Sequence, residues 1–135
     1  MDKAYLEQTW SKLEGKVDRM IAQLGGKTPH VAGADGKYDD TPMEWWTSGF
    51  WAGILWVMYD MTGKEHYKEA AWNWDVKMEE RFVQKAQNFH HDVGFQFLST
   101  AVIKHAITGD AEGLRRGLDA ANFLKAEERA IEVKG

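Results

Sequence analysis

Two stretches of this chain share one plan: a polar segment, a strongly apolar helix, a Thr-Gly pair, and a helix that is apolar on one side only. The pairs are Thr62-Gly63 and Thr108-Gly109, which lie 46 positions apart. Such spacing is typical of helical-hairpin repeats, in which a buried inner helix is followed by a half-exposed outer helix. Repeats of this kind stack as a solenoid or close into a ring, so the chain is limited to helical architectures.

Apolar residues recur every three or four positions along most of the chain, which indicates amphipathic helices. The pattern predicts five helices: Leu6 to Leu24, about Glu44 to Met61, Tyr67 to Ala86, about Asp92 to Thr108, and Leu114 to Leu124. No convincing alternation of period two is present, so the predicted fold class is all-α. The tail from Lys125 to Gly135 is polar and has no clear cap.

Residues 27–43 interrupt the helical pattern. They hold both prolines of the chain and show no periodicity, so we expect a loop between the first and second helices. With 135 residues in total, the chain is expected to form a single all-α unit, 1–135, with one core.

Composition excludes several classes of function. Lys and Arg number 17, Asp and Glu number 21, and no basic arm is present, so we expect no partner among nucleic acids or membranes. Without cysteine, disulfides, thiolate metal sites and cysteine nucleophiles are excluded. The N-terminus lacks a signal segment, and the longest apolar stretch, Phe50 to Met61, is too short to span a bilayer. A cytoplasmic location is therefore expected.

The polar segments that precede the two inner helices supply the candidate site. In a closed ring these segments converge at one mouth, and here they carry Trp45, Trp46, Ser48, His90, His91 and Asp92. Sugars have apolar C–H faces and hydroxyl edges, so their sites combine aromatic platforms with carboxylates and imidazoles. The residues therefore indicate a saccharide pocket, although another polar ligand could use the same set.

Each candidate also has a plain structural interpretation. Asp is a favoured N-cap residue, so capping explains Asp92 as well as ligand binding does. Trp46 is balanced between core and platform, whereas four other tryptophans are expected in the core: Trp51, Trp56, Trp72 and Trp74. His90 and His91 are neighbours that should point apart, so no metal site is predicted. The isolated histidines are expected to be structural or exposed: His30, His66 and His105.

One ordered run of motifs resembles a known family. Its parts are Trp46-Thr47-Ser48-Gly49-Phe50-Trp51-Ala52-Gly53-Ile54-Leu55-Trp56, Tyr59, Thr62-Gly63, His90-His91-Asp92-Val93-Gly94-Phe95 and Thr108-Gly109-Asp110, preceded by Pro29-His30-Val31 and Lys37-Tyr38. Over roughly residues 28 to 124, the run resembles the N-terminal part of unsaturated glucuronyl hydrolases, which form glycoside hydrolase family 88. The rhamnogalacturonyl hydrolases of family 105 are the nearest relatives of that family.

This resemblance implies an (α/α)6 barrel, a toroid of inner and outer helices. It implies hydrolysis of oligosaccharides that end in a Δ4,5-unsaturated uronic acid, the products of polysaccharide lyases. In that family the vinyl ether is protonated, water adds across it, and neither a metal nor an organic cofactor is required. By motif position, Asp92 corresponds to a catalytic aspartate, and His91 and Trp46 correspond to residues that contact the substrate.

The chain also departs from the family pattern. Trp45 and Ser48 stand where Asp or Asn is more usual, and the match decays after Leu124. The chain ends before the region that carries the family's principal acid/base Asp, so we expect an N-terminal portion that is inactive by itself. The alternatives are a catalytically inactive helical module with weak sugar binding, or an interaction protein that self-associates through exposed inner helices.

Overall fold

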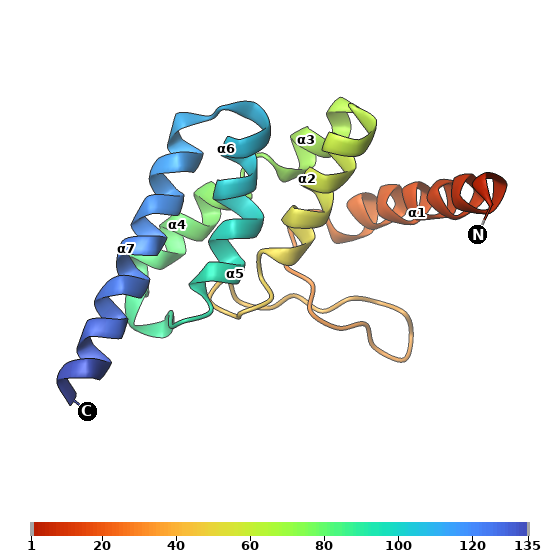
Figure 1. Cartoon of the computed structure of the whole chain (residues 1–135). Helices are drawn as coiled ribbons and strands as arrows, with labels where there is room; N and C mark the ends of the chain where they lie inside the picture. The colour runs from red at the N-terminus through yellow and green to blue at the C-terminus, as the bar shows by residue number, and fades with distance from the viewer. Residues whose placement is uncertain (1, 135) are drawn as a thin grey trace.

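The first helix, α1, stands partly apart from the rest of the chain. The computed structural model describes residues 2–134, in which α1 spans Lys3–Leu24. The Asp2 carboxylate caps this helix by accepting from the Tyr5 backbone N–H at 2.7 Å. The N-terminal half of α1 extends away from the other helices (Figure 1). Val17 and Leu24, in its second half, are buried against the core.

The first hairpin consists of α2, α3 and α4. The inner helix α2 spans Phe50–Thr62, and the outer segment is divided into α3 (Glu65–Ala71) and α4 (Trp74–Gln84). The sequence predicted one continuous outer helix. Its interruption follows from the Trp72 carbonyl, which accepts from the Lys104 ammonium at 3.0 Å and is drawn out of the helical ladder.

The second hairpin has a single unbroken inner rod. α5 (Val93–Phe97) continues through a π-helical turn, Leu98–Val102, into α6 (Ile103–Thr108), and the outer helix α7 spans Ala111–Lys134. The polar tail therefore stays helical, beyond the predicted end at Leu124. This extension has a simple cause, since residues 118–134 contain neither Gly nor Pro and are rich in strong helix formers.

The two Thr-Gly turns are built alike, which confirms the predicted repeat. Thr62 Oγ1 donates to the carbonyl of Met58 at 2.7 Å, and Thr108 Oγ1 donates to that of Lys104 at 2.7 Å. The glycines that follow have φ of 70° and 77°, in the left-handed region that favours glycine. The two inner helices therefore end in the same way, with the same threonine hydrogen bond and the same glycine conformation.

Residues 25–49 connect α1 to α2. Apart from an isolated antiparallel bridge between Ala32 and Tyr38, the described part of this segment consists of turns and extended chain. α2 begins at Phe50 rather than at about Glu44, because residues 43–49 form turns. A short 3-10 turn, Ala86–Asn88, leads from α4 toward α5.

Two apolar clusters fill the interior. The first joins α1, α2, α3 and the start of α4, and it contains Trp51, Trp56 and Trp74, as predicted. The second joins α4, α5 and α7 around Met78 and Phe97. Trp72 is only partly buried and packs against the first cluster. Within residues 2–134, no helix is both long enough and apolar enough to cross a membrane.

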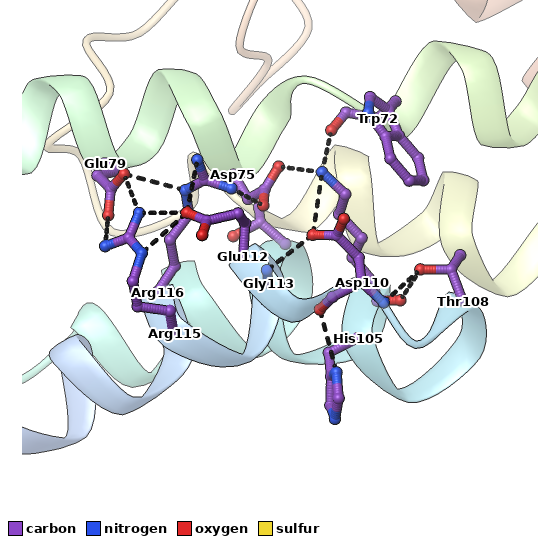
Figure 2. A network of polar contacts seen from close by, with 12 residues as sticks. Trp72, Asp75, Glu79, His105, Thr108, Asp110, Glu112, Gly113, Arg115 and Arg116 are labelled. Atoms are coloured by element: carbon purple, nitrogen blue, oxygen red, sulfur yellow. Dashed lines mark hydrogen bonds and ion pairs between the residues drawn. The ribbon is translucent and has the colours of Figure 1, made fainter.

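A buried ion network holds the outer helices against the second inner rod (Figure 2). Lys104 on α6 lies 3.0 Å from the Asp75 carboxylate on α4, and Arg116 on α7 lies 3.0 Å from the other oxygen of Asp75. Glu79 extends the network by bonding to Arg116 and to the more exposed Arg115. Since Lys104 and Asp75 are almost fully buried, each needs the other's charge to offset its desolvation.

Candidate functional site

The starts of α2 and α5 lie at the same end of the molecule, as the hairpin repeat predicts (Figure 1). Phe95, in the first turn of α5, packs its ring against that of Trp46, with centroids 6.2 Å apart. The Phe95 N–H in turn donates to the Asp92 carbonyl at 3.0 Å. Phe95 therefore links the segment that carries Trp46 to the segment that carries Asp92.

Three aromatic rings form an exposed patch at this end. Trp46, Phe50 and Phe95 contact one another edge to face, with centroid separations of 5.8, 6.2 and 5.9 Å. Their exposed fractions are 37%, 37% and 50%. Aromatic rings that pack together and still reach solvent offer apolar surface to the C–H face of a sugar.

Asp92 lies immediately before α5, yet it does not cap the helix with its side chain. Among the described residues, no backbone N–H in the first turn of α5 donates a capping hydrogen bond to its carboxylate. The oxygens instead lie 3.6 Å from His90 Nδ1 and 3.4 Å from His91 Nε2. The capping interpretation of Asp92 is therefore wrong, and the carboxylate is free to accept from a ligand.

The two imidazoles beside Asp92 were predicted to point apart, but they lie close together. The rings of His90 and His91 lie with centroids 4.8 Å apart, and one donor atom from each of the three residues falls within 4.8 Å of the others. These residues could hold a cation. Ligand atoms around zinc are about 3.3 Å apart in a tetrahedral shell, so the three side chains would have to move closer together to do so.

His30 joins the site from the loop before α2. Its Nδ1 lies 3.1 Å from Thr47 Oγ1, and its ring packs edge-on against Trp45 and Trp46 at 5.6 and 6.2 Å. The Asp39 carboxylate holds this part of the loop by accepting from the backbone N–H groups of His30 and Val31. These backbone hydrogen bonds, from His30 first, hold the pKa of Asp39 below its ordinary value.

An ion pair with α4 holds the turn that carries Trp46. Arg81 on α4 donates twice to the Glu44 carboxylate, at 2.8 Å from Nε and 2.8 Å from Nη2. This pairing lowers the pKa of Glu44. Ser48, which the sequence placed at the mouth, is fully buried instead, and its hydroxyl lies 3.7 Å from Met78 Sδ.

Sequence reasoning missed three residues of this site: His30, Phe95 and Gln96. His30 was expected to stand alone, because the partners of its ring are separated from it by 15 or more positions and only the folded loop brings them together. The available signal was Pro29-His30-Val31, which resembles a loop segment of a known family. Gln96 gave no signal, since its role depends on backbone carbonyls of a distant turn.

Comparison with known proteins identifies relatives over most of the chain. The chain is 34% identical over 116 residues to the unsaturated glucuronyl hydrolase of Bacillus sp. strain GL1, which covers 86% of this chain and 31% of that protein. It is 30% identical over 115 residues to the unsaturated chondroitin disaccharide hydrolase of Streptococcus pneumoniae, covering 80% of this chain and 29% of the relative. No protein-family model matches the chain.

Solved structures agree with these relatives. A mutant unsaturated glucuronyl hydrolase from Streptococcus agalactiae superposes with a TM-score of 0.85 at 25% identity, covering 95% of this chain and 34% of that one. Another crystal structure of that enzyme, complexed with dGlcA-GalNAc6S, gives a TM-score of 0.75 at 26% identity over 93% of this chain and 33% of its own.

The chain spans about a third of the length of the relatives it matches. The predicted fold class is confirmed, since the described residues form helical hairpins that superpose on part of an α/α toroid.

Proposed function

Over the part that it spans, this chain belongs to the unsaturated glucuronyl hydrolases, and we propose that it forms one side of a site for oligosaccharides that end in a Δ4,5-unsaturated uronic acid. The observation that carries this proposal is the joining of an aromatic patch to a carboxylate-imidazole cluster through Phe95. Each half supplies what the other lacks, an apolar platform on one side and polar partners on the other.

The proposed reaction is hydration of a vinyl ether rather than displacement at the glycosidic carbon. A proton adds to the double bond of the unsaturated sugar, water adds to the carbon beside the ring oxygen, and the hemiketal opens and releases the remaining sugar. The step that needs stabilisation is the protonation, because positive charge develops on the sugar ring. A carboxylate close to that ring stabilises this charge.

Three residues carry the proposed roles. The Asp92 carboxylate accepts sugar hydroxyls and balances the developing charge, and its side chain is only 20% exposed, which limits screening by water. His91, with an 83% exposed side chain, donates an imidazole N–H to the substrate. Trp46 provides the stacking platform. All three belong to segments that precede inner helices, as the hairpin repeat requires.

We propose further that the 135-residue chain binds such a sugar weakly and does not hydrolyse it. This part of the proposal rests on its coverage of about a third of the related enzymes and on the single carboxylate of its candidate site. Vinyl-ether hydration requires a proton donor as well as a charge-balancing group. Asp92 is assigned to charge balance and His91 to substrate contact, so the proposal leaves the proton donor to the part of the relatives that this chain does not span.

The test uses the purified chain and an unsaturated glucuronyl disaccharide. Binding is followed by NMR line shifts, and hydrolysis by loss of the ultraviolet absorbance of the conjugated double bond. We expect binding that Asp92→Asn and Trp46→Ala each weaken by about tenfold, a loss of 1.4 kcal/mol, and no loss of absorbance. Asp60→Asn and Tyr5→Ala are the matched controls, since both residues are exposed on helices outside the site. Equal binding by Asp92→Asn and wild type would rule out the site.

A second function is favoured by an apolar groove between α1, α2 and the second inner rod. The groove has a volume of about 740 Å³ and is lined by side chains such as Leu13, Ile54, Val57 and Leu98. Ile54, Val57 and Leu98 are 46%, 50% and 59% exposed, which is unusual for neighbouring large apolar residues. A second copy of the chain presents the same apolar helix faces, so we propose self-association through this groove.

Self-association predicts a mass that rises with concentration in light scattering. Val57→Glu, which places a charge in the lining of the groove, is expected to hold the chain as a monomer, whereas Val83→Glu, equally apolar but on α4 and 75% exposed, leaves the mass unchanged. A wild-type chain that stays monomeric across the whole concentration range would contradict this second function.

A further inference from the structure

Gln96 is a buried amide one helical turn after Asp92. Only 1% of its surface is exposed. Its Nε2 lies 3.2 Å from the carbonyl of Met43, 3.2 Å from that of Glu44 and 3.1 Å from that of Trp45. The Ser48 hydroxyl oxygen lies a further 3.4 Å from the same nitrogen. An amide nitrogen carries two hydrogens, so the three carbonyls and this hydroxyl share two donated bonds. One side chain of α5 thus holds three consecutive carbonyls of the turn that leads to Trp46.

The carbonyls converge on Gln96 because residues 43–49 form turns instead of helix. A helical start at Glu44 would direct these carbonyls along the helix axis toward its own N–H groups. The amide of Gln96 therefore competes with helix formation and accounts for the late start of α2 at Phe50. Arg81 holds the same turn through the Glu44 carboxylate.

We propose that Gln96 is a positioning residue that sets the separation between the Trp46 platform and Asp92. This inference rests on the proposed sugar site, since it assigns Gln96 to the construction of that site. Gln96 itself touches no solvent and makes no contact with the ligand. It acts by fixing the turn of Trp46 to the helix that begins beside Asp92, so that platform and carboxylate face one ligand at a constant distance.

A purely structural role would differ in its consequences. If Gln96 served only to satisfy buried carbonyls, its loss would lower stability throughout the core and leave the geometry of the mouth unchanged in the folded fraction. A positioning role changes the mouth in the folded state. The Trp46–Phe95 ring contact, at 6.2 Å, reports on the mouth, and the Phe82–Phe97 contact, at 5.6 Å, reports on the core.

The experiment compares wild type, Gln96→Met and the exposed control Gln8→Met by nuclear Overhauser effects between aromatic rings. We expect Gln96→Met to lose the Trp46–Phe95 effects, to keep the Phe82–Phe97 effects, and to bind an unsaturated glucuronyl disaccharide about tenfold more weakly. A folded Gln96→Met that keeps both ring contacts would overturn the inference. If wild type fails to bind the disaccharide, the proposed function fails, while the ring contacts still decide the role of Gln96.

Gln96→Glu provides a second variant in case Gln96→Met does not fold. A carboxylate has no hydrogen to donate to the three carbonyls, whereas a protonated carboxyl donates one. Burial favours the neutral form of a glutamate, so acidification from about pH 8 to about pH 5.5 is expected to restore the Trp46–Phe95 effects in this variant. Ring contacts that stay present while the introduced carboxyl is ionised would overturn the inference.

Discussion

Gly49 and Gln96 touch at the crossing of the two inner helices. A Cβ atom on Gly49 would lie 2.7 Å from the Gln96 carbonyl oxygen and 3.1 Å from its Cα atom. Both obstacles are backbone atoms, so no side-chain rotation relieves them. This contact allows the segments before α2 and α5 to approach closely enough for Phe95 to reach Trp46.

The first prediction concerns this crossing. Gly49→Ala forces the two backbones apart and is expected to lower the free energy of unfolding by about 1–3 kcal/mol, the usual cost of overpacking. Urea unfolding followed by circular dichroism measures the change. Gly94→Ala is the matched control, because a Cβ there meets no atom within 4 Å; it is expected to gain about 0.5–1 kcal/mol from helix propensity. A Gly49→Ala chain as stable as wild type would show that the crossing is loose.

The second prediction concerns the buried ion network. Lys104→Met leaves Asp75 with Arg116 as its remaining partner, and the cost of an incompletely paired buried charge is about 3 kcal/mol in the free energy of unfolding. The control is Arg115→Met, whose side chain is 45% exposed and whose ion pairs are worth less than about 1 kcal/mol. Equal losses in urea unfolding for both variants would show that burial of Lys104 contributes nothing.

Much of the fold followed from sequence because the relevant signals are local. The Thr-Gly pairs end both inner helices through short-range hydrogen bonds, and positive φ at Gly63 and Gly109 is a property of glycine itself. The break between α3 and α4 did not follow from sequence, since it depends on Lys104 reaching the Trp72 carbonyl from a position 32 residues away. Periodicity carries no information about such a contact.

The site was predicted in outline but not in detail. The repeat placed Trp46 and Asp92 at one end, because both precede inner helices. The choice between capping and a free carboxylate at Asp92 depended on the orientation of its side chain toward His90 and His91. The preference of Asp for the position before a helix does not distinguish these two roles. His30 and Gln96 act on residues distant in sequence, so neither residue type nor spacing indicated them.

The third prediction concerns acid. The pKa of Glu44 is lowered from its ordinary 4.5, chiefly by the Arg81 hydrogen bond. The unfolded chain therefore takes up this proton at a higher pH than the folded chain does. The stabilisation is fully present above pH 4.5 and is lost as the pH falls below 4.5 through the lowered pKa of the folded state. The urea concentration at the midpoint of unfolding, measured from neutral to acidic pH, should therefore decrease as the pH falls below 4.5.

Glu44→Gln separates this contribution from other carboxylates. The variant is expected to be less stable than wild type at neutral pH, since an amide pairs weakly with Arg81, and the difference should shrink as the pH falls below 4.5. Glu7→Gln on the exposed face of α1 is the control and should leave the profile unchanged. A constant difference between Glu44→Gln and wild type at all pH values would contradict the assignment.

The fourth prediction concerns His30, the site residue contributed by the loop. Its ring supports both Trp45 and Trp46, and its Nδ1 lies 3.1 Å from Thr47 Oγ1. His30→Ala removes both contacts and is expected to weaken binding of an unsaturated glucuronyl disaccharide by about tenfold. Because His30 is exposed, the free energy of unfolding of the chain should change by no more than about 0.5 kcal/mol in this variant.

His30→Phe keeps the ring and loses the hydrogen bond, so binding by this variant shows which contact positions Trp46. Wild-type affinity indicates ring packing, and the affinity of His30→Ala indicates the bond to Thr47. His66→Ala, on the exposed surface of α3, is the control. Unchanged affinity in His30→Ala would remove the loop from the site.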